Sequence, residues 1–231
     1  MAGNSLCIIT ARGGSKRIPR KNIKPFCGKP IIAYSIQAAL ESGLFADVMV
    51  STDDEEIAQV ARDFGASVPF MRSAENSDDF ATTKDVVEEV LARYEEAGTH
   101  FDSACCLYPT APFVTGVKLR QAFELLDDAD TVMTVVPFSF PPQRGLIQED
   151  GCVRFWQPEN ATKRSQDLEP VLHDAGQFYL FKTYFLPQAA TLLGPRTRGF
   201  QVSELEVQDI DNPSDWDIAE IKYKRMVSLD Q

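Results

Sequence analysis

The sequence has few of the features that mark membrane, secreted or nucleic-acid-binding proteins. No apolar run in its 231 residues approaches the length of a bilayer span, and no signal peptide precedes the first apolar segment. Positive charge is scarce, with 23 Lys and Arg against 34 Asp and Glu and a net charge of −11. We therefore expect a cytoplasmic protein with no membrane or nucleic-acid partner.

Motifs for zinc, redox and triad chemistry are also missing. None of the five cysteines forms a C-x-x-C pair, which argues against a zinc site or a redox pair. Cys7, Cys105 and Cys106 lie in apolar runs that suit buried thiols. With only two histidines, His100 and His173, the chain offers no Ser-His-Asp arrangement to assign.

What the sequence does contain is an alternation of strand-like and helix-like segments. Strands are expected at 6–9, 48–51, 67–70, 101–108, 131–136, 173–181 and 201–207, and helices at 31–42, 55–64, 84–97, 116–127, 183–189 and from 213 onward. This alternation predicts an α/β fold with a doubly wound, Rossmann-like, mostly parallel sheet. The 44% hydrophobic content suffices for one core, so we expect a single domain over residues 1–231.

The alternation stops at about residues 137–171. Prolines at 137, 141 and 142 exclude a central strand or helix there. Two short runs around Asp150-Gly151 predict a hairpin over 146–156. This excursion is rich in aromatic residues, which suits a partner surface, and a long mobile loop is the alternative.

The stretch from residue 6 to residue 22 joins the first strand to a basic loop. Its Gly13-Gly14 pair lets the backbone approach a ligand with N–H groups turned toward it. Five cations fall within ten residues: Arg12, Lys16, Arg17, Arg20 and Lys21. In an acidic chain this cluster predicts a polyphosphate ligand, and a basic surface loop or a nuclear-type basic patch is the alternative.

The second chemical feature is the Asp209-Ile210-Asp211 sequence. If this segment is a strand, both carboxylates point to the same face and repel each other unless a cation sits between them. Magnesium is commonly held by one or two carboxylates together with substrate phosphates. The alternative is N-terminal capping of the last helix, which explains Asp215 well and Asp209 poorly.

The basic loop fits neither the P-loop nor the dinucleotide fingerprint. Instead, ARGGSKRIPRKNI followed by GKPIIAYSI, with VSTDDEEI and YPTAPF further on, resembles the sugar nucleotidyltransferases. Within them it is similar to the cytidylyltransferases that activate nine-carbon acidic sugars, a family that includes the CMP-sialic acid synthetases. The resemblance implies CTP and an acidic nonulosonic sugar as substrates, Mg²⁺ as cofactor with Mn²⁺ as an alternative, and a homodimer formed through the excursion.

The resemblance also implies roles for individual residues. The implied catalytic residues are Arg12, Lys16 and Asp211, and the implied metal ligands are Asp209 and Asp211. The implied nucleotide-binding residues are Ala11, Arg12, Gly13, Gly14, Ser15, Lys21, Asn22, Arg72 and Thr83. The implied sugar-binding residues are Tyr108, Arg164 and Gln177, and Arg164 could equally be an interface or surface cation.

The segment HDAGQFYLF at 173–181 differs from the form typical of sialic-acid enzymes and resembles the branch that acts on pseudaminic acid, a bacterial 5,7-diamino sugar used in glycan or flagellin glycosylation. Alternative sugars are N-acetylneuraminic acid, legionaminic acid and 3-deoxy-manno-octulosonate. A non-catalytic nucleotide-binding relative is the alternative of another class, because a fold does not by itself fix an activity.

Overall fold

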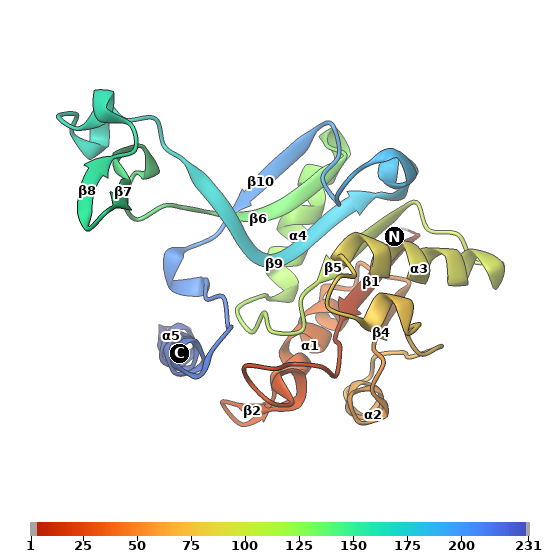
Figure 1. The fold of residues 1–231 in the computed structure, drawn as a ribbon. Helices are drawn as coiled ribbons and strands as arrows, with labels where there is room; N and C mark the ends of the chain where they lie inside the picture. The colour runs from red at the N-terminus through yellow and green to blue at the C-terminus, as the bar shows by residue number, and fades with distance from the viewer. Residues whose placement is uncertain (1–3, 230–231) are drawn as a thin grey trace.

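The computed structural model describes residues 4–229, which fold around a six-stranded sheet of order β10-β6-β9-β5-β1-β4 (Figure 1). Its strands are β1 (Ser5–Thr10), β4 (Asp47–Ser51), β5 (Ser103–Leu107), β6 (Thr131–Pro137), β9 (Leu172–Lys182) and β10 (Thr197–Gln201). β1 pairs in parallel with β4 and β5, and β10 pairs in parallel with β6. Only β9 is antiparallel to its neighbours in this sheet, so the predicted mostly parallel sheet is confirmed.

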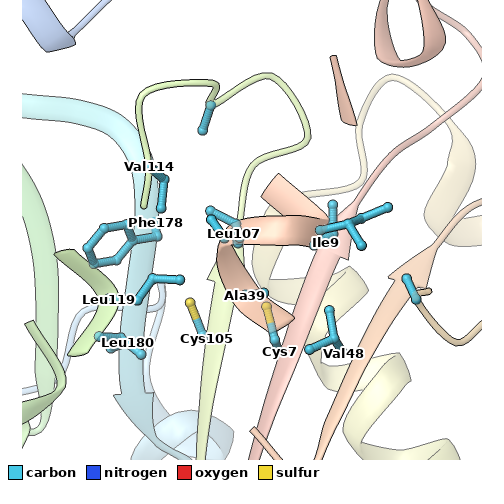
Figure 2. Close-up of a cluster of buried hydrophobic side chains, with 14 of the residues drawn as sticks. Cys7, Ile9, Ala39, Val48, Cys105, Leu107, Val114, Leu119, Phe178 and Leu180 are labelled. Atoms are coloured by element: carbon cyan, nitrogen blue, oxygen red, sulfur yellow. The ribbon is translucent and has the colours of Figure 1, made fainter. Parts of the chain in front are cut away.

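Helices cover both faces of this sheet. They are α1 (Ile32–Ser42), α2 (Glu55–Asp63), α3 (Thr83–Glu96), α4 (Gly116–Glu124) and α5 (Pro213–Leu229). Cys7 and Leu107 face the layer of α1 and α4, as Figure 2 shows, whereas the adjacent Ile8 and Cys106 face α3. Neighbouring residues of a strand point to opposite faces, so strands buried on both sides read as continuous apolar runs. The doubly wound arrangement is therefore confirmed.

Short elements complete the described chain. The remaining strands form two separate hairpins, β2 (Pro25–Phe26) with β3 (Lys29–Pro30), and β7 (Leu146–Glu149) with β8 (Cys152–Phe155). The 3-10 helices are η1 (Lys21–Ile23), η2 (Glu75–Ser77), η3 (Leu125–Asp128), η4 (Pro142–Arg144), η5 (Pro158–Asn160), η6 (Ser165–Asp167), η7 (Thr183–Gln188) and η8 (Glu204–Glu206). No helix within residues 4–229 is both long enough and apolar enough to cross a membrane.

Two predicted strands are wrong. The segment 67–70 makes only an isolated bridge, between Ser67 and Met49. The strand expected at 201–207 lies earlier, at β10, in a Gly/Pro/Arg-rich stretch that had the composition of a loop. Gly199 explains this difference, because a Cβ at that position would lie 2.7 Å from Val135 Cγ2. The glycine permits a close approach of β10 to β6 and does not mark a turn.

The predicted hairpin of the excursion is confirmed as β7 and β8. In Figure 1 this hairpin projects away from the sheet beyond the ends of β6 and β9. Large apolar side chains are exposed along the excursion: 85% of Phe140, 65% of Val153 and 59% of Trp156. An apolar surface on a projecting arm is typical of a segment that a partner covers.

A separate apolar cluster joins the basic loop to the end of the chain. Trp216 of α5 packs against Phe26, with ring centroids 5.5 Å apart. Ile18 of the basic loop and Ile210 of the D-I-D segment are buried in the same cluster. This packing fixes two segments that are almost 200 residues apart in the sequence next to each other.

Candidate active site

A cleft of about 640 Å³ opens where β1, β4 and β5 end. Because these strands are parallel, their carboxyl ends share one edge of the sheet, and ligands of open α/β sheets bind at such an edge, where the strand order reverses. The cleft is lined by Thr10, Arg12, Ser15, Lys16, Arg17, Lys21, Asn22, Arg72, Asn76, Asp78, Asp79, Ala81, Thr82, Thr83, Val86, Tyr108, Pro109, Thr110 and Asp211.

The basic loop is held in shape from behind. Asn22, only 6% exposed, donates from Nδ2 to the backbone oxygen of Arg12 at 2.9 Å. The Gly13 N–H donates to Asp53 Oδ1 at 2.8 Å, so it is engaged within the protein. A Cβ on Gly13 would meet Asp54 Oδ2 at 2.8 Å. Gly13 therefore serves the close packing of this loop on the β4–α2 corner.

A second tie to the same corner runs through Arg20. Its backbone adopts a left-handed conformation, with φ 57°, and its guanidinium forms a bidentate ion pair with Asp54. Asp54 also caps α2 by accepting from the Ile57 N–H at 3.0 Å. The hydrogen bond from Arg20 lowers the pKa of the Asp54 carboxyl. A non-glycine residue with positive φ is held in place here by a charge-assisted, two-pronged contact.

Arg12 and Lys16 face the cleft and share one counter-ion. Arg12 Nη1 lies 3.0 Å from Asp79 Oδ1, and Lys16 Nζ contacts the other oxygen of the same carboxylate. These two cations are 41% and 77% exposed, respectively, so solvent and ligands can reach both.

Arg72 is a buried cation on the floor of the cleft. It is 8% exposed and donates from Nε and Nη2 to the hydroxyl and backbone oxygens of Ser51, at 2.9 and 2.6 Å. Burial lowers the pKa of this guanidinium. The charges of Asp53 and Glu89 act on it less strongly than burial does, and among the described residues it forms no ion pair, so its charge is available to a ligand with acceptor oxygens.

The D-I-D segment lies against the basic loop in irregular, non-strand structure, so the predicted strand geometry is wrong for these residues. Burial of Ile210 anchors the segment, and Asp211 lines the cleft. Lys21 Nζ donates to the backbone oxygen of Ile210 at 2.7 Å and lies 3.9 Å from Asp211 Oδ1. Arg17 Nη2 lies 2.8 Å from the same carboxylate oxygen. Cations of the basic loop thus hold Asp211 at the cleft.

Asp209 and Asp211 fit a divalent cation by their chemistry. Burial, followed by the nearby charges of Asp211 and Asp215, raises the pKa of the Asp209 carboxyl. A cation bound between the two acids would offset the burial and the charge repulsion that disfavour the ionised form of Asp209. Within residues 4–229, no cluster of three or more His, Cys, Asp or Glu side chains is placed to hold a metal ion by itself. A magnesium ion here would therefore take its other oxygen ligands from the substrate and water.

The residues assigned to the sugar are not all in the cleft. Tyr108 lines it, and burial raises the pKa of its hydroxyl. Gln177 lies behind Tyr108, is 3% exposed and donates to the Glu206 backbone oxygen at 2.5 Å. Its Oε1 is buried and accepts no hydrogen bond from the residues that the structure describes. Arg164 lies in the excursion, 71% exposed and paired with Asp167, so this chain does not bring it to its own cleft.

The structure gathers most of the predicted site residues into one place. The predicted residues that line the cleft are Arg12, Ser15, Lys16, Lys21, Asn22, Arg72, Thr83, Tyr108 and Asp211. Those that do not line it are Ala11, Gly13, Gly14, Asp209, Arg164 and Gln177. Four acids that contact the basic loop were missed: Asp53, Asp54, Glu56 and Asp79. The VSTDD sequence was a signal for the first two, but no pattern linked Asp79 to the loop.

Fold and cleft together define an α/β nucleotide-binding protein of the nucleotidyl-transfer class. A basic loop follows the first strand at the sheet's carboxyl edge, and the Asp211 carboxylate lines the same cleft as its cations.

Sequence comparison gives the family. The family model described as "Cytidylyltransferase" matches residues 6–209, and the chain belongs to this family. It is 40% identical to a pseudaminic acid cytidylyltransferase of Campylobacter jejuni, over 95% of this chain and 96% of that protein. It is 33% identical to a CMP-N,N'-diacetyllegionaminic acid synthase of Legionella pneumophila, over 93% and 94% of the two chains.

A solved structure shares the fold. It is a CMP:2-keto-3-deoxy-manno-octonic acid synthetase complexed with CTP, with a TM-score of 0.70 at 18% identity. The match covers 96% of this chain and 99% of that chain. The predicted nucleotidyltransferase fold is thereby confirmed.

Proposed function

We propose that this protein transfers CMP from CTP to the anomeric hydroxyl of an acidic nine-carbon sugar, with pseudaminic acid as the preferred substrate, and releases pyrophosphate. One observation carries the proposal: Arg12, Lys16 and Asp211 line the same cleft. Cations and a carboxylate gathered in one cleft are what a phosphoryl-transfer site needs to hold a metal-bound triphosphate.

The reaction requires positioning more than covalent participation of the protein. The anomeric oxygen attacks the α-phosphorus of CTP, the bond to the β-phosphate oxygen breaks, and the hydroxyl loses its proton as pyrophosphate leaves. Arg12 and Lys16 would meet the negative charge that grows on the leaving phosphates. Arg72, buried and without a carboxylate partner among the described residues, would bind an acceptor oxygen of the nucleotide.

We propose Mg²⁺ as the cofactor, with Mn²⁺ able to replace it. Asp211, and Asp209 directly or through water, would hold the ion against the triphosphate. When bound, the ion neutralises phosphate charge and polarises the phosphoryl oxygens. Lys21 and Arg17 already hold Asp211 at the cleft, which would keep this carboxylate oriented before the ion arrives.

Pseudaminic acid is favoured because the C. jejuni relative named for it matches almost the whole chain. The sugars that compete with it also carry a carboxylate, so discrimination must arise at the C5 to C9 end. A pocket that hydrogen-bonds an acylamino group rejects a sugar that leaves its polar groups unpaired. Gln177 would take such a role, because its buried Oε1 accepts no hydrogen bond from the described residues.

A non-catalytic nucleotide-binding relative is the second candidate. It is disfavoured because Lys16 and Asp211 are both present and both line the cleft. The test is pyrophosphate release from CTP with Mg²⁺ and a panel of pseudaminic, N-acetylneuraminic, legionaminic and 3-deoxy-manno-octulosonic acids. We expect the highest kcat/KM for pseudaminic acid. Binding of CTP without turnover of any sugar would favour the non-catalytic alternative.

We further propose that the protein acts as a homodimer through the excursion at 137–171. The exposed apolar side chains of this arm support a partner surface of like chemistry. If Arg164 contacts the sugar carboxylate at all, it would have to do so at the cleft of the second subunit, because in its own chain it is paired with Asp167.

A further inference from the structure

The loop between η2 and α3 has an unusual relation to the cleft. We refer to residues 78–81 as the acidic loop. It contributes Asp78, Asp79 and Ala81 to the lining, next to the cations Arg12 and Lys16. In an acidic protein, two adjacent acids at the mouth of a site for an anionic substrate would repel that substrate. Their presence therefore needs an explanation.

The two acids have different tasks. Asp78 Oδ1 accepts the backbone N–H groups of Phe80 and Ala81, both at 2.8 Å, so it shapes the loop itself. The side chain of Asp79 extends to the basic loop, where its two carboxylate oxygens contact Arg12 and Lys16. Arg12 Nη1 also donates to the Asp78 backbone oxygen at 3.1 Å. One carboxylate thus pairs with both cations, as an oxyanion of a phosphate group would.

Both ends of the acidic loop are firmly attached. On the η2 side, Glu89 accepts from the Ser73 N–H, the Ser73 hydroxyl and Asn76 Nδ2, at 2.6 to 2.9 Å. On the α3 side, Thr82 and Asp85 form a reciprocal capping box. The acidic loop is therefore a short segment that is held on both sides.

The middle of the acidic loop has little to hold it. Phe80 is 89% exposed, so it provides no apolar anchor. Asp79 is 49% exposed at its side chain, and both of its cation partners are more than 40% exposed. Solvent-exposed ion pairs are weak and exchange readily with other anions. Across the described residues, the hydrogen bonds from the acidic loop to the basic loop all involve Arg12 or Lys16.

We propose that Asp79 is an internal counter-anion: it orients Arg12 and Lys16 in the free enzyme and is displaced when the triphosphate binds. The inference rests on the proposed function. A triphosphate carries several negative charges and Asp79 carries one, so the triphosphate binds Arg12 and Lys16 more strongly and displaces Asp79. Asp79 then sets the affinity for CTP without taking part in the chemical step. It is a positioning residue of the free state.

The test is Asp79→Asn, which keeps the side-chain shape and removes the charge. We expect KM for CTP to fall by about two- to tenfold, the range that loss of exposed ion pairs supports, while kcat changes by less than about twofold. Calorimetric titration with inorganic pyrophosphate should show a dissociation constant lowered by the same factor. Added salt should shrink the difference, because exposed charges are screened.

Asp102→Asn is the matched control, since it removes one charge from an exposed acid at the amino end of β5, the opposite edge of the sheet. It should leave KM and pyrophosphate affinity unchanged. An equal gain in CTP and pyrophosphate affinity in both variants would show that net charge alone causes the effect, and it would overturn the proposal. An unchanged or raised KM for CTP in Asp79→Asn would also overturn it. If the wild-type protein neither binds pyrophosphate nor turns over CTP, the proposed function fails instead.

Discussion

At the scale of single residues, several charged groups of the cleft are already paired with one another in the free protein. Arg12 and Lys16 pair with Asp79, and Arg17 pairs with Asp211. Each partner has the charge of the group that would replace it: a carboxylate for a phosphate, a guanidinium for a metal ion. The site can thus keep its geometry in an acidic protein before any ligand binds.

Lys16→Ala should lower kcat more than it raises KM for CTP. A cation that meets charge growing on the leaving phosphates contributes mainly in the transition state. Loss of one such donor typically costs about 10²–10³ in rate. Steady-state kinetics over a range of CTP concentrations would measure both constants. A change confined to KM would make Lys16 a ground-state binding residue.

Asp211→Ala should abolish turnover, because the proposed metal ion loses its main protein ligand. Asp209→Ala should lower turnover less than Asp211→Ala if Asp209 binds the metal ion through water. This expectation fits the position of Asp209, which does not line the cleft. Titration of Mn²⁺ into each variant in the presence of CTP, followed by electron paramagnetic resonance, would report binding independently of activity. Full activity of Asp211→Ala at low Mg²⁺ would contradict the assignment.

The sequence predicted the parts of the site that are local in the chain. The basic loop is a continuous segment, so its cations could be recognised together. Asp79 could not be linked to it, because Lys16 and Asp79 are 63 residues apart and meet only once the parallel strands align their carboxyl ends. The N–H of Gly13 is likewise satisfied by Asp53, 40 residues away. Such contacts depend on strand order, which the hydrophobic pattern does not specify.

At the scale of elements, Asp130 joins three segments at the amino end of β6. It is 2% exposed and accepts from the Arg196 backbone N–H and Nη2, each at 3.0 Å, and from the Tyr184 hydroxyl at 2.7 Å. Arg196 directly precedes β10 and Tyr184 belongs to η7. The position of β10 depends on these hydrogen bonds of Asp130 and on the close approach of Gly199 to Val135 of β6. Local composition contains neither contact, and the strand was therefore predicted too late in the sequence.

The hydrogen bond from Arg196 and that from Tyr184 lower the pKa of Asp130 to about 2. A folded-state pKa below the unfolded value of about 3.9 contributes stability that is present above that value. This contribution is lost as pH falls toward the folded-state pKa.

Asp130→Asn should therefore be less stable than wild type at neutral pH, and the difference in the free energy of unfolding should shrink between about pH 4 and pH 2. Urea unfolding over this pH range would measure it. Asp128→Asn, at an acid that is 87% exposed and 3.7 Å from Arg198, is the matched control and should show little effect. A difference that stays constant with pH would contradict the account.

At the scale of the whole molecule, the excursion is a projecting arm that leaves large apolar side chains such as Phe140 and Trp156 exposed. Its hairpin could be predicted from two short runs around Asp150-Gly151, and its direction away from the sheet could not (Figure 1). Direction depends on how β6 and β9 pair, including the irregularity between Met133 and Val135.

Trp156→Glu should convert the proposed dimer to a monomer, because it places a charge in an apolar interface. Light scattering coupled to size-exclusion chromatography would measure the mass. Val117→Glu, a substitution at a side chain that is 52% exposed on α4, is the control and should leave the mass unchanged. A wild-type protein that is monomeric at micromolar concentration would contradict the dimer.

In the proposed reaction, the basic loop and Asp211 together direct transfer of CMP to an acidic sugar. The most direct measurement is ³¹P nuclear magnetic resonance of CTP incubated with pseudaminic acid, Mg²⁺ and the protein. We predict equal amounts of a CMP-sugar phosphodiester and pyrophosphate, and neither product with Asp211→Ala. Unchanged CTP, or its conversion to CDP and phosphate, would contradict the account.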